Sequence, residues 1–472
     1  MNHPDPPRSS LDPPPDEMRR IARLAADQVS GYLESLGDLP VAQPGTAADF
    51  AELVDEPLPE DGLGIEDGIR FFEERVVPRL TRVNHPRFHA YIPCPSSFAG
   101  AVGAMLAAGA NPFTGSWLGG ATLASLELTV LRWIAEMVAW PRDAAGILTS
   151  GGSMANLVGL AAARARFGRK TLERGRIYVS EEGHASLDKA AIILGYAPET
   201  IRSVPVDDDL RMRVDVLEQW IDEDSAAGAV PFFVSGNAGT VNTGSVDPMN
   251  GLADLCGRRG LWFHVDGAYG GFAALAPEGR RRLAGMERAD SLTLDPHKWL
   301  YAPMGTGCAL VRDETALRSA FSAHGEYLRD LPADEVNFLD RGPELSRPGR
   351  VLGVWMVVRS AGRKELARQV EADLALARLA AELLQEDPGL ELVVPPELSV
   401  VAFRHRARPG ESENDRAARD LRLMDVTLRE GAMMLSTTRI RGRSAVRMVV
   451  MNHRTTEEHV RKSVARIREL AE

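Results

Sequence analysis

Short apolar runs alternate with segments of helical periodicity through the middle of the chain, from residue 96 to residue 350. Gly, Ser, Asn or Asp residues bound each run, and a helix-like segment follows it. Repeated units of this kind build a largely parallel sheet. The pattern therefore predicts a large α/β domain over 96–350 whose chemistry lies in the loops that leave the strand ends. Its runs include GILTSGG, RIYVS, PFFVSGNAGTV, LWFHVDGAY, DSLTLD and GCALV.

Helical spacing dominates the chain before this domain. The first fifteen residues hold six prolines and little that is apolar, which predicts a tail outside any core. From Asp16 onward apolar residues fall on one helical face, and a second helical stretch covers Ile65 to Leu80. A lone amphipathic helix ahead of the core packs either on a partner subunit or on its own chain, and spacing alone favours neither. We assign residues 1–95 to a proline-rich tail and a helical dimerisation segment.

A smaller α+β domain is predicted for residues 351–472. A long helical pattern runs to Leu384, and the apolar runs LELVV and LSVVAFRH then read as strands. Another helix, the strand-like run AVRMVVM and a last helix from Thr456 complete the pattern. The basic stretch RIRGRSAVR fits a strand with solvated flanks.

Composition narrows the class of protein. A formal net charge of −11 without clustered Lys or Arg argues against a nucleic-acid surface. The chain has three cysteines, Cys94, Cys256 and Cys308, which are too few and too widely spaced for a disulfide framework or a zinc site. We therefore expect that the protein binds no metal and is located in the reducing cytoplasm. The longest apolar stretch, Ala99 to Ala110, is too short to span a bilayer, and the N-terminus carries no export pattern.

Two apolar runs end abruptly in charged residues, and these residues form the sharpest feature of the sequence. HVDGAYGG contains Asp266, and DSLTLDPHKWL contains Asp295, His297 and Lys298. A lysine in such a turn is ordinarily an exposed loop residue, whereas a partly desolvated lysine stays neutral enough to form a Schiff base. An aspartate at the end of a neighbouring strand can hold a pyridine nitrogen protonated. Their pairing favours a Schiff-base site over an exposed loop.

A glycine-rich turn and a histidine extend this candidate site. In GILTSGGSMANLVGLAAARA, Gly152 and Ser153 lie between a strand and a strong helix, where backbone N–H groups and the helix dipole attract an anion. A plain turn and cap is the ordinary explanation, but together with Asp266 and Lys298 the turn becomes a phosphate cradle. His184 in EEGHASLDKAA could cap a helix or stack on a flat cofactor ring.

These motifs, in this order, resemble the pyridoxal-phosphate decarboxylases of the aromatic-amino-acid and glutamate decarboxylase group. The resemblance implies an α/β fold of the type I class of pyridoxal-phosphate enzymes, with a mainly parallel seven-stranded sheet in the large domain, a small C-terminal α+β domain and an N-terminal helical extension. It covers nearly the whole chain and includes HPRFHAYIPCPSS, SLELTVLRWIAEMV, TSGGSMAN, GHASLDKA, NAGTVNTGSVDP, HVDGAYGG, DPHKWL, AFSAHGEYL and ELSRPGRVLGVW.

The same resemblance implies a role for each site residue. Lys298 forms the Schiff base with pyridoxal 5′-phosphate, and Asp266 pairs with the pyridine nitrogen, so that loss of CO2 gives a quinonoid intermediate. Ala268 packs on one face of the ring and His184 stacks on the other, while Tyr327 protonates the substrate carbon from a mobile loop. The positions around the phosphate are matched by Gly152, Ser153, Asp295 and His297.

The substrate pocket matches the family less closely than the cofactor site does. Tyr91 agrees with the aromatic decarboxylases, but Ile92 stands where they often carry an aromatic residue and Cys94 where a threonine is common. Val241 replaces the second threonine of the usual Gly-Thr-Thr. We assign the substrate pocket to Tyr91, Ile92, Cys94, Phe113, Trp299 and Ser346.

We therefore expect a homodimeric L-amino-acid decarboxylase with shared active sites, acting on an aromatic or similarly bulky substrate. Two other outcomes stay open within the family, oxidative deamination to an aldehyde and decarboxylation of an acidic amino acid. Retention of both His184 and Tyr327 favours simple decarboxylation. A cofactor-binding protein without turnover is the alternative from a different class, and the intact set of Lys298, Asp266, His184 and Tyr327 argues against it.

Overall fold

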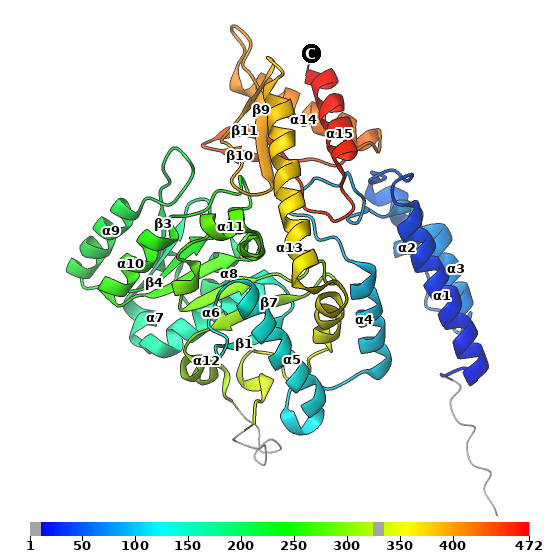
Figure 1. Cartoon of the computed structure of the whole chain (residues 1–472), viewed down its shortest axis with the longest axis horizontal. Helices are drawn as coiled ribbons and strands as arrows, with labels where there is room; N and C mark the ends of the chain where they lie inside the picture. The colour runs from blue at the N-terminus through cyan, green and yellow to red at the C-terminus, as the bar shows by residue number, and fades with distance from the viewer. Residues whose placement is uncertain (1–10, 324–334, 472) are drawn as a thin grey trace, which may run out of the picture.

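The computed structural model describes residues 11–323 and 335–471 (Figure 1). Most of the predicted proline-rich tail, residues 1–10, and Tyr327 of the predicted loop lie outside the described residues. Among the described residues, we find no helix with the length and apolar character needed to cross a membrane.

A seven-stranded sheet organises the large domain, in the order β1-β7-β6-β5-β4-β2-β3. The strands from β6 to β3 run parallel, and β7 is antiparallel to both of its neighbours, β1 and β6. The mainly parallel sheet is therefore confirmed. Its strands are β1 (Ala145–Thr149), β2 (Gly175–Ser180), β3 (Ile201–Val204), β4 (Val230–Asn237), β5 (Trp262–Gly267), β6 (Ser291–Leu294) and β7 (Gly307–Val311).

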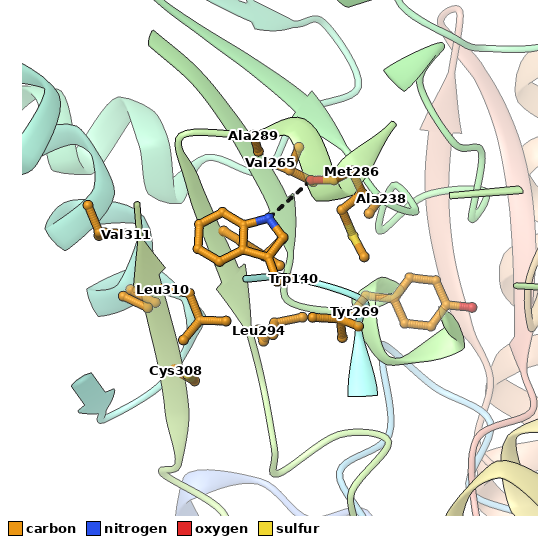
Figure 2. Close-up of a cluster of buried hydrophobic side chains, with 14 of the residues drawn as sticks. Trp140, Ala238, Val265, Tyr269, Met286, Ala289, Leu294, Cys308, Leu310 and Val311 are labelled. Carbon is orange, nitrogen blue, oxygen red and sulfur yellow. Dashed lines mark hydrogen bonds between the residues drawn. The ribbon is translucent and has the colours of Figure 1, made fainter. Parts of the chain in front are cut away.

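Helices enclose this sheet, and α6 is the one that packs across most of it. Residues 155–163 of α6 are all buried, and the helix contacts β1, β4, β5, β6 and β7. Figure 2 shows Trp140 in the core among side chains of β5, β6 and β7, with its indole N–H donating to the Met286 carbonyl at 3.3 Å. The helices of this domain are α4 (Phe98–Ala110), α5 (Trp117–Met137), α6 (Gly152–Phe167), α7 (Lys170–Arg174), α8 (Ser186–Ile193), α9 (Val214–Ala226), α10 (Met249–Arg259), α11 (Pro277–Arg282) and α12 (Glu314–Phe321).

The C-terminal part forms a four-stranded antiparallel sheet in the order β10-β11-β9-β8. The strand β10 was not predicted. It pairs with β11 through a tight turn at Arg441 and Gly442, which have φ of 51° and 74°, so the basic stretch covers both arms of a hairpin rather than one strand. The elements are β8 (Leu390–Leu392), β9 (Val400–His405), α14 (Glu413–Arg429), β10 (Ser436–Ile440), β11 (Arg443–Val449) and α15 (Glu457–Ala471).

One long helix, α13 (Arg350–Gln385), belongs to both hydrophobic cores. Its residues from Val351 to Leu374 pack in the core of the large sheet, and those from Ala377 to Leu384 pack in the core of the small sheet. Figure 1 shows the helix running from one part of the molecule into the other. The core thus changes within α13, and our division of the chain at residues 95 and 350 stays a prediction.

The N-terminal helices lie at one side of the molecule (Figure 1). Here α1 (Pro15–Ser35) contacts α3 (Ile65–Phe71), and α2 (Ala51–Val54) lies between them in the chain. The stretch expected to be one helix up to Leu80 instead passes from α3 into a π-helical turn, Phe72–Val76, and a 3₁₀ turn, Val77–Arg79. Pro78 has no N–H to continue the helical ladder.

A buried ion pair ties the segment before α13 to the large sheet. Arg347 donates to the Glu127 carboxylate at 2.6 Å and to the Leu148 carbonyl at 2.8 Å, and the Leu148 N–H donates to the same carboxylate at 2.9 Å. The two charged side chains are 1% and 3% exposed, so neither charge has water as an alternative partner.

We expect Arg347→Met to lower the free energy of unfolding by about 3–5 kcal/mol, because Glu127 would keep an uncompensated buried charge. Urea unfolding measures this. Arg461→Met is the matched control, since Arg461 pairs with Glu457 and both side chains are more than half exposed, so its loss should cost about 1 kcal/mol or less. Equal losses in the two variants would contradict the expectation.

Candidate active site

A cavity of about 470 Å³ opens where the carboxyl ends of the central strands meet the start of α6. Asp266 stands at the end of β5, Asp295 directly follows β6, and Gly152 begins α6. All the predicted cofactor residues line this cavity, together with two from the predicted substrate pocket: Gly152, Ser153, His184, Asp266, Ala268, Asp295, His297, Lys298, Tyr91 and Ile92.

Lys298 forms an ion pair inside the cavity. Its Nζ lies 2.9 Å from Oδ2 of Asp295, and both side chains are at least 85% buried. Burial lowers the pKa of Lys298, but the Asp295 carboxylate outweighs burial and the net shift is upward. The sequence predicts that desolvation favours the neutral amine, but in the structure a carboxylate within hydrogen-bond distance stabilises the ammonium.

Asp266 is held by two hydrogen bonds on the cavity floor. Its Oδ2 accepts from Nδ2 of Asn156 at 2.8 Å, and its Oδ1 accepts from the Ala268 N–H at 3.1 Å. The side chain therefore cannot rotate away from the cavity without losing both donors.

A chain of directional hydrogen bonds behind Asp266 sets the orientation of Asn156. The Asp266 carboxylate can only accept, so the Asn156 amide presents its NH₂ to Asp266 and its Oδ1 to Nε2 of His264, which donates to it at 3.0 Å. Burial lowers the pKa of His264 to about 4, so the ring is neutral and its Nδ1 accepts from Ser291 at 2.7 Å. Ser291 in turn accepts from the Trp262 indole at 2.7 Å.

The same amide group orients His184. Nδ2 of Asn156 also donates to Oγ of Ser186 at 2.8 Å, and Oγ lies 2.8 Å from Nδ1 of His184. The Ser186 backbone N–H donates to Nδ1 at 3.2 Å, so this nitrogen is an acceptor. A neutral His184 ring therefore carries its proton on Nε2.

The cavity reaches the start of α6, where Gly151, Gly152 and Ser153 line it. A Cβ on Gly152 would lie 2.9 Å from both Oδ2 of Asp295 and Cβ of Ala268, so a larger residue would clash there. Nδ1 of His297 donates to the Thr306 carbonyl at 2.6 Å, and its Nε2 lies 3.8 Å from Oδ2 of Asp295.

Trp299 corrects one of our pocket assignments. Its side chain is fully buried, stacks on Tyr269 with ring centroids 5.2 Å apart, and donates to Asp373 at 2.8 Å. Tyr301 donates to the same carboxylate at 3.0 Å. Trp299 is therefore a core residue that anchors the Lys298 turn on α13, and no substrate can reach it within this fold.

The other predicted pocket residues divide into two groups. Cys94 is partly buried and does not line the cavity, and burial raises the pKa of its thiol to about 11, so it stays protonated. Phe113 and Ser346 are exposed, and neither lines the cavity of its own chain. Tyr327 lies outside the described residues.

Several cavity residues were missed by sequence reasoning. Asn156 lies one helical turn after Ser153 on the same face of α6, and Ser186 lies two residues after His184, so spacing from the predicted residues could have found both. Val241, which the sequence already indicated as a replaced threonine, also lines the cavity. Asn237, Thr240 and further residues line it as well, but no local signal distinguishes them: Ser150, Gly151, Met154, Gly239 and Tyr269.

Comparisons with known proteins agree with this geometry. The model for the pyridoxal-dependent decarboxylase conserved domain matches residues 48–406. The chain belongs to the pyridoxal-dependent decarboxylase family. It is 35% identical to an aromatic-L-amino-acid decarboxylase of Bacillus atrophaeus, over 97% of this chain and 96% of that one. It is 30% identical to a phenylacetaldehyde synthase of Arabidopsis thaliana, over 97% and 96%. The crystal structure of Oryza sativa TDC with PLP and tryptamine superimposes with a TM-score of 0.92 at 28% identity, covering 98% and 99% of the chains.

The protein is thus a pyridoxal-phosphate-dependent amino-acid decarboxylase, and its cavity fits that cofactor. A buried amine, a carboxylate held by two hydrogen-bond donors and a glycine turn at a helix start line one cavity, and these are the groups that an aldehyde, a pyridine nitrogen and a phosphate require.

The anchor at Asp373 makes stability depend on pH in a predictable way. Burial raises the pKa of Asp373 to about 7, whereas an unfolded aspartate titrates at about 3.9. Because the folded state keeps this proton longer, wild-type stability falls as pH rises through this window. Relative to Asp373→Asn, which cannot ionise, we expect a loss of about 2–4 kcal/mol between pH 4.5 and 7.5 in urea unfolding.

Asp254→Asn serves as the control for this comparison. Asp254 is 56% exposed, so its substitution should leave the slope of stability against pH unchanged. A constant difference between wild type and Asp373→Asn across the range would contradict the prediction.

Proposed function

We propose that the protein removes the α-carboxylate of an aromatic L-amino acid and releases the amine and CO2. The observation that supports this most is that Lys298, Asp266 and His184 line one cavity. The similarity to an aromatic-L-amino-acid decarboxylase over nearly the whole chain supports the substrate class.

Each cofactor residue has a proposed task. Pyridoxal 5′-phosphate supplies a ring that accepts the electron pair left at Cα when the carboxylate departs. Lys298 would hold the cofactor through its amine, and Asp266 would keep the pyridine nitrogen protonated. Ala268 and His184 would flank the two ring faces. Around the phosphate we place Gly152, Ser153, Asp295 and His297.

The chain's own groups would also handle the substrate. His184 offers an Nε2–H to the cavity, and this donor can orient a substrate carboxylate across the ring plane. Tyr327 stays our candidate for the proton donor to Cα.

The lining of the cavity supports a bulky apolar substrate over an acidic one. Tyr91 and Ile92 contribute an aromatic and an aliphatic surface, and Lys298 is the sole Lys or Arg among the lining residues that the structure describes. A side-chain carboxylate would need a second cation, because a charge without a partner is costly to bury.

Oxidative deamination is the second candidate, since the chain is also similar to a phenylacetaldehyde synthase. The two reactions differ in their products. Simple decarboxylation yields amine and CO2, whereas the oxidative reaction consumes O2 and yields aldehyde, ammonia, CO2 and peroxide.

We expect an aerobic panel of L-amino acids to give stoichiometric amine and CO2 from an aromatic substrate, and no turnover of glutamate or aspartate. Lys298→Ala should lower kcat by about 10³-fold or more, because the covalent attachment and its proton are lost. Lys189→Ala, an exposed lysine on α8, is the control. Aldehyde with peroxide would establish the oxidative candidate instead, and turnover of acidic substrates alone would overturn the aromatic proposal.

We also propose that the protein is a homodimer with shared active sites. No described residue of α1 is buried, and Val29 and Phe72 border an apolar hollow of about 850 Å³ between α1 and α3. Phe113 and Ser346, unused in their own chain's cavity, are candidates for reaching the partner's site. The cytoplasmic location stays a prediction.

Sedimentation of the wild type should give a dimer, and Val29→Glu should shift it toward monomer, because a charge in the hollow opposes burial against a second copy. Ala26→Glu on the exposed face of α1, outside the hollow, is the matched control. A wild-type monomer with full activity would contradict the dimer.

A further inference from the structure

A buried carboxylate stands in the proposed phosphate cradle. The Asp295 side chain is 3% exposed, and its Oδ1 has no hydrogen-bond partner among the described residues, whereas Oδ2 lies 2.9 Å from Nζ of Lys298. Both oxygens face the start of α6, at 2.9 and 3.3 Å from a Cβ built on Gly152. A negative group thus occupies a site whose helix terminus favours a second negative group.

The charged groups around Asp295 show which of them balances its carboxylate. Lys298 is its ion-pair partner, and Nε2 of His297 lies at 3.8 Å. Burial raises the pKa values of the thiols of Cys94 and Cys308, and Asp295 adds a further upward contribution, so both thiols stay neutral. On the first turn of α6 the side chains carry no charge. Among the described residues, the Lys298 ammonium is therefore the cation that balances the Asp295 carboxylate.

Cofactor binding disturbs this balance twice. The Lys298 nitrogen is drawn to the cofactor's aldehyde carbon, and a phosphate brings up to two negative charges into the cradle. A carboxylate and a phosphate dianion cannot share a dry site as unprotonated groups, because two anions at hydrogen-bond distance repel and neither can donate.

We propose that Asp295 takes up one proton when the cofactor phosphate binds and donates it in a hydrogen bond to a phosphate oxygen. The proton comes from solvent and forms an O–H bond on Asp295; no other bond is made or broken in this step. The inference rests on the proposed placement of the phosphate at Gly152 and Ser153. Retention of the cofactor then depends on pH through Asp295, whereas the groups that bind the ring are unaffected.

The proposal predicts a pH signature that belongs to the phosphate alone. If phosphate binding consumes one proton, the dissociation constant rises with pH, approaching tenfold per pH unit once the phosphate is fully dianionic, above about pH 7. Pyridoxal lacks the phosphate and should not show this extra rise. The ratio of the two dissociation constants therefore isolates the proton on Asp295 from events at Lys298.

The experiment titrates the full-length apo-protein with pyridoxal 5′-phosphate and with pyridoxal from pH 6 to pH 8.5, following absorbance and tryptophan fluorescence. Wild type should show a rising ratio of dissociation constants above about pH 7, and Asp295→Asn a flat one. Asn keeps the shape of the side chain and supplies an N–H donor without a titrating proton. Any effect of the lost Lys298 ion pair acts on both ligands and cancels in the ratio.

Ser153→Ala separates this proposal from the assignment of the phosphate site. If the phosphate lies at the start of α6, this variant should weaken pyridoxal 5′-phosphate several-fold more than pyridoxal. Equal effects on the two ligands would overturn the assignment and, with it, the role of Asp295. A selective Ser153→Ala effect combined with the same slope in wild type and Asp295→Asn would overturn the proton uptake alone.

Discussion

The active-site floor depends on one sequence of directional hydrogen bonds, from the Trp262 indole through Ser291 and His264 to Asn156. Each link has a single direction, because the Asp266 carboxylate can only accept from the Asn156 NH₂ and the buried imidazole is neutral. The same NH₂ group donates to Ser186. Core residues of the sheet thereby hold the Asn156 amide in the orientation that Asp266 requires.

The charges in the cavity are arranged as two separate systems. Asp266 is solvated by neutral donors, an amide NH₂ and a backbone N–H. Asp295 is paired with the ammonium of Lys298. The first arrangement involves no atom of Lys298, whereas the second must change when the lysine nitrogen forms a covalent bond. The hydrogen bonds of Asp266 therefore do not depend on Lys298, whereas the ion pair of Asp295 does.

Much of the fold could be predicted because buried parallel strands are apolar throughout and end in polar residues, as at Asp266 and Asp295. The motifs also identified most of the lining of the cavity. The errors arose where long-range contacts decide: Trp299 follows the key lysine in sequence, yet its partners Tyr269 and Asp373 are distant and bury it. Likewise, a carboxylate three residues from Lys298 reversed the effect of burial on its amine, and the hairpin of β10 depends on a turn without the usual Asn-Gly signal.

The sharing of α13 between the two cores limits how this protein can be divided or recombined. The helix supplies Val351 to Leu374 to one core and Ala377 to Leu384 to the other. Close to the point where the helix passes from one core to the other, Asp373 accepts hydrogen bonds from Trp299 and Tyr301, which follow Lys298 in the chain. A cut before α13 would open the large core and release that turn, while a cut after it would expose the apolar face prepared for the small sheet. A chimera that takes its C-terminal part from a relative is therefore most stable when all of α13 comes from that relative, together with the segment that contains Trp299 and Tyr301.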